Sequence, residues 1–179
     1  MRQAGDPGDP RGTQALRLFV VMLGGRHARA NTEVHDVVFA VATELRGAYP
    51  QLRQQWFGAA EGLHIDAWMT VDGVGDRQVR LRPEPPPPES PRLYFVNLGG
   101  YLPGVFGEDH RYDLVVAADP AEAKRKALRQ AGDWVKPHRD ALFEVDACMA
   151  LGPIGGLHVH LIPGPHSGIA CQSDYIVLS

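Results

Sequence analysis

The sequence predicts an α+β protein made of two tandem ββαββ units, which we expect to pack as one pseudo-twofold body with antiparallel-rich sheets. Three observations lead to this prediction. The chain contains an internal repeat, and each copy has runs of β-branched and aromatic residues that end in Gly-Gly. Each copy also has one stretch with apolar residues at helical spacing.

The repeat becomes visible when the sequence is shifted by 75 residues. RLFVVMLGG at 17–25 then falls on RLYFVNLGG at 92–100, and ten of the 26 positions from 17 to 42 are identical. The same shift places Glu33 and His35 on Glu108 and His110, and a shift of 74 places His64 and Asp66 on His138 and Asp140. Matching positions are therefore expected to occupy matching places in the fold.

Each copy is expected to begin with two strands, at 17–23 and 37–42 in the first and at 92–98 and 112–117 in the second. The Gly-Gly after each first strand is interpreted as a turn that needs a positive φ. Alternating apolar residues after His64 predict a half-buried third strand. Short strands at 78–82 and 157–162 close the copies, and 174–178 has the composition of one more strand.

A helix is expected between the second and third strands of each copy. In the second copy Asp119 is a favoured N-cap, and Pro120 is tolerated at the first helical position. In the first copy the helical spacing runs from Leu45 to Trp56 and is interrupted by Pro50. A proline inside a helix costs about 3 kcal/mol, so a kink or a fresh helical start is expected there.

These elements divide the chain into four parts: a disordered N-terminal tail (1–16), a first repeat (17–82), a proline-rich linker (83–91) and a second repeat with a C-terminal strand extension (92–179). The linker, PEPPPPESP, has few backbone donors for a sheet and is expected to form an extended polyproline spacer.

The composition is typical of a folded soluble protein, with 44% apolar and 22% charged residues, and the cytoplasm is the expected location. A net charge of −3 offers no basic surface for nucleic acid. No apolar run reaches the roughly 20 residues that span a bilayer, and no apolar stretch precedes Leu16 as an export signal would require. Cys148 and Cys171 are therefore expected to stay reduced. We expect no nucleic-acid or membrane partner, and a homodimer is compatible with the sequence.

Several motifs resemble the bacterial family catalogued as domain of unknown function 1543. They are LGG at 23–25, HDVVFAVA at 35–42, HIDAW at 64–68 and FVNLGGY at 95–101. The resemblance covers residues 17 to 147 and implies a chain with one or two copies of the domain. It implies no activity, substrate or catalytic residue.

Two His-x-Asp pairs are the first candidates for chemistry. His64 and Asp66, like His138 and Asp140, are two residues apart on expected strands, so each pair points to one face of its sheet. If the copies face each other, two imidazoles and two carboxylates converge, which suits a divalent metal or acid–base catalysis. Alternatively, each pair is a structural hydrogen-bonded device at a sheet edge, copied by the duplication.

Weaker binding candidates follow the first strand of each copy. They are Gly24, Gly25 and His35 in the first copy, and Gly99, Gly100 and His110 in the second. A glycine pair after a strand can cradle a phosphate, but no helix starts behind either pair. Histidines that cap a loop are the alternative interpretation of His35 and His110.

The segment from Gly156 to Pro163 resembles the end of the histidine-triad nucleotide hydrolases. His158 would correspond to their nucleophilic histidine and His160 to the last of the triad, but Gly156 stands at the first position. His158 and His160 are also weak metal-ligand candidates, together with His166 and Cys171, because zinc takes such ligands. Exposed histidines on a solvated strand are the alternative.

No complete catalytic motif is present. The expected function is therefore a non-enzymatic module that binds a small ligand or a protein in the cleft between the repeats. The alternative is a small hydrolase, either metal-assisted through His64, Asp66, His138 and Asp140, or a degenerate histidine-triad-like nucleotide hydrolase. The sequence requires no cofactor.

Overall fold

The computed structural model describes residues 15–101, 104–131 and 144–178 and has an α+β architecture. In chain order the elements are β1 (Arg17–Gly25), β2 (Val34–Ala42), α1 (Leu45–Gln55), β3 (His64–Val71), β4 (Gly73–Val74), β5 (Arg77–Arg82), β6 (Arg92–Gly100), β7 (Asp109–Ala117), α2 (Pro120–Ala131), β8 (Glu144–Ala150), β9 (His158–Pro163) and β10 (Ile169–Val177). Neither helix of the described residues is long and apolar enough to cross a membrane.

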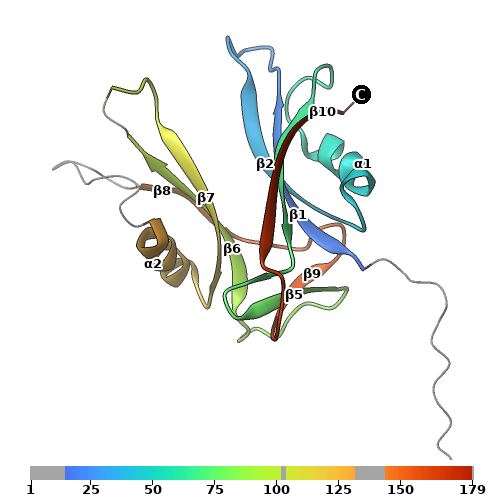
Figure 1. Ribbon diagram of the computed structural model, residues 1–179, viewed down its shortest axis with the longest axis vertical. Coiled ribbons are helices and arrows are strands. Elements are labelled where there is room, and N and C mark those ends of the chain that lie inside the picture. The colour runs from blue at the N-terminus through green and yellow to red at the C-terminus, as the bar shows by residue number, and fades with distance from the viewer. Residues whose placement is uncertain (1–14, 102–103, 132–143, 179) are drawn as a thin grey trace, which may run out of the picture.

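The strands form three sheets, and all pairings among the described residues are antiparallel. A four-stranded sheet has the order β10-β3-β1-β2, a three-stranded sheet has the order β7-β6-β8, and a smaller sheet has the order β4-β5-β9. The two larger sheets lie side by side with α1 and α2 on their outer sides, and β5 and β9 lie at one end (Figure 1).

The two larger sheets share their hydrogen-bond register. β1 pairs with β2 from Arg17↔Ala42 to Gly25↔Val34, and β6 pairs with β7 from Arg92↔Ala117 to Gly100↔Asp109. Each also has a bulge on its third strand, after Leu23↔Ile65 in the first half and after Leu98↔Val145 in the second.

This register corrects the predicted correspondence of the His-x-Asp pairs. His64 lies opposite Gly24, and Glu144 lies opposite Gly99. The shift that matches β3 to β8 is therefore 80 residues, whereas 74 was expected, because the connection from helix to strand is longer in the second half. His138 and Asp140 lie outside the described residues.

β1 and β6 are buried on both faces. On one face of β1, Phe19, Val21 and Leu23 pack toward α1, and Tyr94, Val96 and Leu98 of β6 likewise pack toward α2. The opposite faces, with Leu18 and Val20 on β1 and Leu93 and Phe95 on β6, join one central core between the halves. The rings of Phe39 and Phe95 meet edge to face across this core, with their centroids 5.4 Å apart.

The last strands of the two halves pair across the halves, and not within the half to which each belongs. β5 pairs with β9, and β10 pairs with the outer edge of β3. The C-terminal strand begins at Ile169, earlier than the expected residue 174, and Leu178 donates a backbone hydrogen bond to Leu63. Residues 83–91 connect β5 to β6 outside any helix or strand, with a turn from Pro87 to Ser90.

The helices begin where the sequence predicts. The Asp119 carboxylate caps α2 by accepting a hydrogen bond from the Glu122 backbone N–H, and the Glu122 carboxylate accepts one from the N–H of Ala118, the residue before the cap. The pKa of Glu122 is lowered, because the Ala118 N–H, the largest cause, and then the Lys126 side chain donate hydrogen bonds that favour the charged carboxylate. α1 begins at Leu45 and continues through Pro50, so no new helix starts there.

The Gly-Gly pairs are not turns, and the prediction of a positive φ at them is wrong. Gly24, Gly25, Gly99 and Gly100 are strand residues with ordinary φ. The first pair is explained by close packing. A Cβ on Gly24 would collide with His64 and lie 2.7 Å from Asp66 Oδ2, and one on Gly25 would lie 2.9 Å from the Trp56 ring.

Candidate functional site

Four polar side chains meet where β1, β2 and β3 come together at one end of the four-stranded sheet. Gly24 is paired with His35 on one side and with His64 on the other. Directly opposite residues of an antiparallel sheet face the same side, so the missing Cβ of Gly24 leaves room between the two imidazoles. Glu33 precedes β2, and Asp66 lies at the bulge of β3. We call Glu33, His35, His64 and Asp66 the His–carboxylate cluster.

The four groups are within contact distance of one another. His64 Nε2 lies 3.1 Å from Glu33 Oε1 and 3.3 Å from Asp66 Oδ1. His35 Nε2 lies 3.2 Å from Asp66 Oδ2 and 3.9 Å from Glu33 Oε2. Each imidazole therefore presents its Nε2 atom to both carboxylates.

His64 is the fixed member of the cluster, since its side chain is only 2% exposed. Its Nδ1 atom lies 2.8 Å from the Gly62 carbonyl oxygen, which can only accept, so Nδ1 carries the proton. The ring also packs against Tyr175 of β10, with the centroids 4.3 Å apart. These contacts aim Nε2 at the carboxylates.

Two buried atoms of the cluster have no hydrogen bond. Within the described part of the chain, His64 Nε2 and Asp66 Oδ2 are each buried without a hydrogen-bond partner. Atoms of the neighbouring cluster residues lie 3.1–3.3 Å from them, so distance is not what leaves them unpaired. A buried polar group left unpaired costs about 1–3 kcal/mol, and such a cost in a native site calls for an explanation.

The remaining members of the cluster are open to solvent. The side chains of Glu33 and His35 are 48% and 46% exposed, and that of Asp66 is 30% exposed. As the side chains stand, no group of three or more His, Cys, Asp or Glu residues in the described ranges is arranged to hold a metal ion. The cluster is thus closed on the His64 side and adjustable on the side of Glu33 and His35.

The second half does not repeat this arrangement among its described side chains. His110 lies at the position that corresponds to His35, and its Nδ1 is 3.2 Å from Asn97 Oδ1. Gly99 and Gly100 continue β6 beside it. Because His138 and Asp140 are outside the described residues, the predicted meeting of two His-x-Asp pairs stays a prediction.

The C-terminal histidines hold loops. His160 Nε2 donates to the Glu84 carbonyl oxygen at 2.8 Å, and so ties β9 to the proline-rich linker. His166 Nε2 donates to the Gly75 carbonyl at 3.1 Å, while its Nδ1 accepts from Gly168. His158 lies on β9 opposite Arg82, and Cys171 is a free, exposed thiol on β10.

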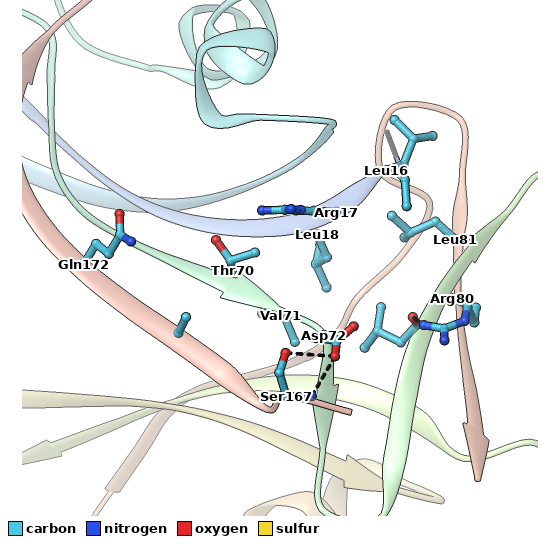
Figure 2. Close-up of a pocket in the computed structure, with 13 residues that line it drawn as sticks. Leu16, Arg17, Leu18, Thr70, Val71, Asp72, Arg80, Leu81, Ser167 and Gln172 are labelled. Carbon is cyan, nitrogen blue, oxygen red and sulfur yellow. Dashed lines mark hydrogen bonds between the residues drawn. The ribbon is translucent and has the colours of Figure 1, made fainter. Parts of the chain in front are cut away.

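A larger cavity of about 880 Å³ lies between β1, β3, β5 and the start of β10. Figure 2 shows Asp72 at its wall, bonded to Ser167. The Ser167 N–H and hydroxyl donate to Asp72 Oδ2 at 2.7 and 2.9 Å, and the N–H is the larger cause of the lowered pKa of Asp72. Arg80 also lines this cavity, and its positive charge is a smaller cause of the lowered pKa of Asp72.

The cleft between the halves contains a small apolar cavity of about 90 Å³, lined by residues of both halves that include Val20, Phe95 and Tyr112. Ligand pockets usually measure about 300–1,000 Å³. None of the four cluster residues lines this cavity.

Glu33 was not predicted as part of the site, and His35 was predicted to have a separate role. The sequence contained a signal for both, since the pair Glu33 and His35 recurs as Glu108 and His110. What joins them to His64 is the pairing of both strands with Gly24, which is non-local.

The chain belongs to the family described as Domain of Unknown Function (DUF1543), whose sequence profile matches residues 30–81. The matched segment includes all four residues of the His–carboxylate cluster. Among solved structures, the chain is similar to "protein Il1583 from Idiomarina loihiensis", with 32% sequence identity and a TM-score of 0.69. That match covers 92% of this chain and 99% of the other. The comparison with curated proteins gave no match.

Proposed function

We propose that this chain is a cation-binding protein whose ligand is held by the His–carboxylate cluster. The observation that carries the proposal is His64, a buried histidine whose Nε2 faces two carboxylate oxygens without a hydrogen bond. A positive charge placed among these atoms gives both orphaned acceptors a partner and offsets the repulsion between the two carboxylates.

The cleft between the halves is the less suitable place for a ligand. Its cavity is small and apolar, whereas the cluster offers charge, an exposed side and a fixed imidazole. These features support a non-enzymatic binding role for the His–carboxylate cluster, and not for the cleft between the halves.

Calorimetric titration tests the proposal with Zn²⁺, Mn²⁺, Ca²⁺ and spermidine as separate probes. At least one of them should bind the wild-type chain, and Glu33→Gln should weaken that binding at least tenfold because it removes one of the two charges. His160→Gln, a histidine variant outside the cluster, should bind as the wild type does. Binding of none of the four probes, or equal loss in His160→Gln, would refute cation binding at this place.

A hydrolase is the second candidate, favoured by the contact between His35 and Asp66. His35 is half exposed, and its Nε2 lies 3.2 Å from the Asp66 carboxylate, so it resembles a general base oriented by an acid. With a bound metal this pair would serve metal-assisted hydrolysis. Hydrolysis of p-nitrophenyl phosphate or acetate that requires added metal, and that is lost in His35→Gln but kept in His158→Gln, is the expected result. Turnover in His35→Gln equal to that of the wild type would exclude this role, whereas loss in His158→Gln alone would favour the histidine-triad-like alternative.

We also propose that residues 17–82 and 92–179 are two copies of one ββαββ unit. The shared register of β1–β2 and β6–β7, and the bulge at the same place in β3 and β8, support this view. In a crystal structure, the Cα atoms of 17–42 should superpose on those of 92–117 with the predicted shift of 75; a superposition that requires another shift would contradict it.

A further inference from the structure

We propose that the cation of the His–carboxylate cluster is a divalent transition-metal ion of the zinc type. Its ligands are Nε2 of His35 and of His64 and one carboxylate oxygen each from Glu33 and Asp66. This inference rests on the proposed cation-binding function and adds the class of the ion.

The spacing of the four groups suits a shared metal ion. Two ligand atoms that bind one zinc ion at about 2.0–2.2 Å in tetrahedral geometry lie roughly 3.3–3.6 Å apart. The nitrogen–oxygen distances of the cluster are 3.1, 3.2, 3.3 and 3.9 Å, and the two imidazoles approach different oxygens of each carboxylate. Each imidazole–carboxylate pair therefore has nearly the separation of two ligands of one ion, and side-chain rotation is needed to bring one oxygen of each carboxylate and both nitrogens around it.

The protonation of His64 is that of a metal ligand. Nδ1 donates to the Gly62 carbonyl oxygen, so in the neutral imidazole the lone pair of Nε2 is directed at the cluster. Metal-bound histidines almost always make such a second hydrogen bond, which fixes their tautomer and orientation. The Tyr175 ring against His64 further restricts the imidazole.

The donor set decides which ion is favoured. Two imidazole nitrogens favour zinc and its neighbours in the first transition series, whereas calcium and magnesium prefer shells made of oxygen. The two carboxylates supply two negative charges and so neutralise a divalent ion. The cluster therefore disfavours calcium and magnesium because of its nitrogen ligands, and not because of its charge.

Binding requires movement on the open side of the cluster. Glu33 and His35 are about half exposed, so their side chains can rotate to admit the ion, while His64 and Asp66 form the fixed half. Because the exposed side faces solvent, a bound ion would keep access to water or to a small anionic ligand.

Cobalt provides a direct probe, because Co²⁺ replaces zinc and absorbs visible light with an intensity that depends on its coordination. After removal of metal with a chelator, Co²⁺ alone should produce visible bands typical of a four- or five-coordinate site, and one equivalent of Zn²⁺ should abolish them. Ca²⁺ and Mg²⁺ in tenfold excess should not.

Variants identify the ligands. His35→Gln and Glu33→Gln change side chains that are about half exposed, and each should lower Zn²⁺ affinity at least about tenfold, since even second-shell changes cost 10–100-fold. His160→Gln should retain full affinity, and far-ultraviolet circular dichroism verifies that each variant is folded. His64→Gln is informative if it folds, and the two exposed variants test the site if it does not.

The outcomes separate the two proposals. Binding of Ca²⁺ or spermidine that Glu33→Gln weakens, without binding of Co²⁺ or Zn²⁺, would overturn the metal assignment and leave a cation-binding protein. Failure of every cation to bind the wild type would overturn both.

Discussion

Gly24 is the residue that makes room for the His–carboxylate cluster, because a side chain there would occupy the space of His64 and Asp66. Gly24→Ala should destabilise the chain by about 1–3 kcal/mol, as overpacking does, and should also abolish cation binding. Gly152→Ala is the matched control, since a Cβ at Gly152 meets nothing within 4 Å. Urea unfolding measures the stability of the two variants, and calorimetric titration measures their cation binding. Equal stability of the two variants would show that the close packing around Gly24 is not needed.

Asp72 makes the stability of the fold depend on pH, and the direction of this dependence follows from its lowered pKa. Its pKa is lowered, mainly because the Ser167 backbone N–H and then the Ser167 hydroxyl donate to it. A carboxylate with a lowered folded-state pKa stabilises the fold above its ordinary value of 3.8 and loses this contribution as the pH falls through the folded-state pKa.

Ser167→Ala removes the hydroxyl but keeps the stronger backbone bond, so the pKa of Asp72 should rise part of the way toward its ordinary value. Acid unfolding should then begin at a higher pH than in the wild type. Carboxyl chemical shifts and urea unfolding between pH 2 and 6 measure both effects. An unchanged titration of Asp72 in this variant would contradict the assigned cause.

At the scale of elements, β10 joins the C-terminus to the cluster. Its Tyr175 packs on His64, although this tyrosine is 65% exposed. Tyr175→Ala should destabilise the chain by about 0.5–1.5 kcal/mol and weaken Zn²⁺ binding, because the imidazole loses its support. Tyr175→Phe keeps the ring and should match the wild type in both. If the phenylalanine variant instead behaves like the alanine variant, the hydroxyl and not the ring is what matters.

The sequence predicts those elements whose signals are local. The α2 start at Asp119-Pro120 follows from cap chemistry, and the strand runs follow from their apolar patterns. The pairing of β5 with β9 and of β10 with β3 joins residues between 76 (Arg82↔His158) and 113 (His64↔Val177) positions apart, and no local signal selects the partner. The interpretation of Gly24-Gly25 as a turn failed for the same reason, because their neighbours Trp56 and His64 come from distant elements.

In the whole molecule, a central core contains residues of both halves, so we expect the two halves to unfold as one cooperative unit. Phe95 of β6 is buried there and contacts both Phe39 of the first half and Tyr112 of the second. Phe95→Ala should cost about 3–5 kcal/mol and still give a single unfolding transition. Phe106→Ala changes an exposed ring and should stay within about 0.5 kcal/mol. Unfolding should be followed by tryptophan fluorescence and by circular dichroism. Different midpoints of the two unfolding curves would contradict a shared core.

The candidate site was predictable in part. His64 and Asp66 were expected to act together, and the structure places them 3.3 Å apart. Their expected partners were His138 and Asp140, whereas the described neighbours are Glu33 and His35 from the strand on the other side of Gly24. A repeat indicates which positions correspond, but only the strand order indicates which of them meet.

The metal site can be tested by anomalous diffraction from a crystal grown with Zn²⁺, with data collected on both sides of the zinc absorption edge. We expect one strong anomalous peak bonded to Nε2 of both His35 and His64, with carboxylate oxygens of Glu33 and Asp66 completing the shell. A crystal saturated with Zn²⁺ that shows no peak there, with His64 Nε2 hydrogen-bonded to a carboxylate instead, would contradict it.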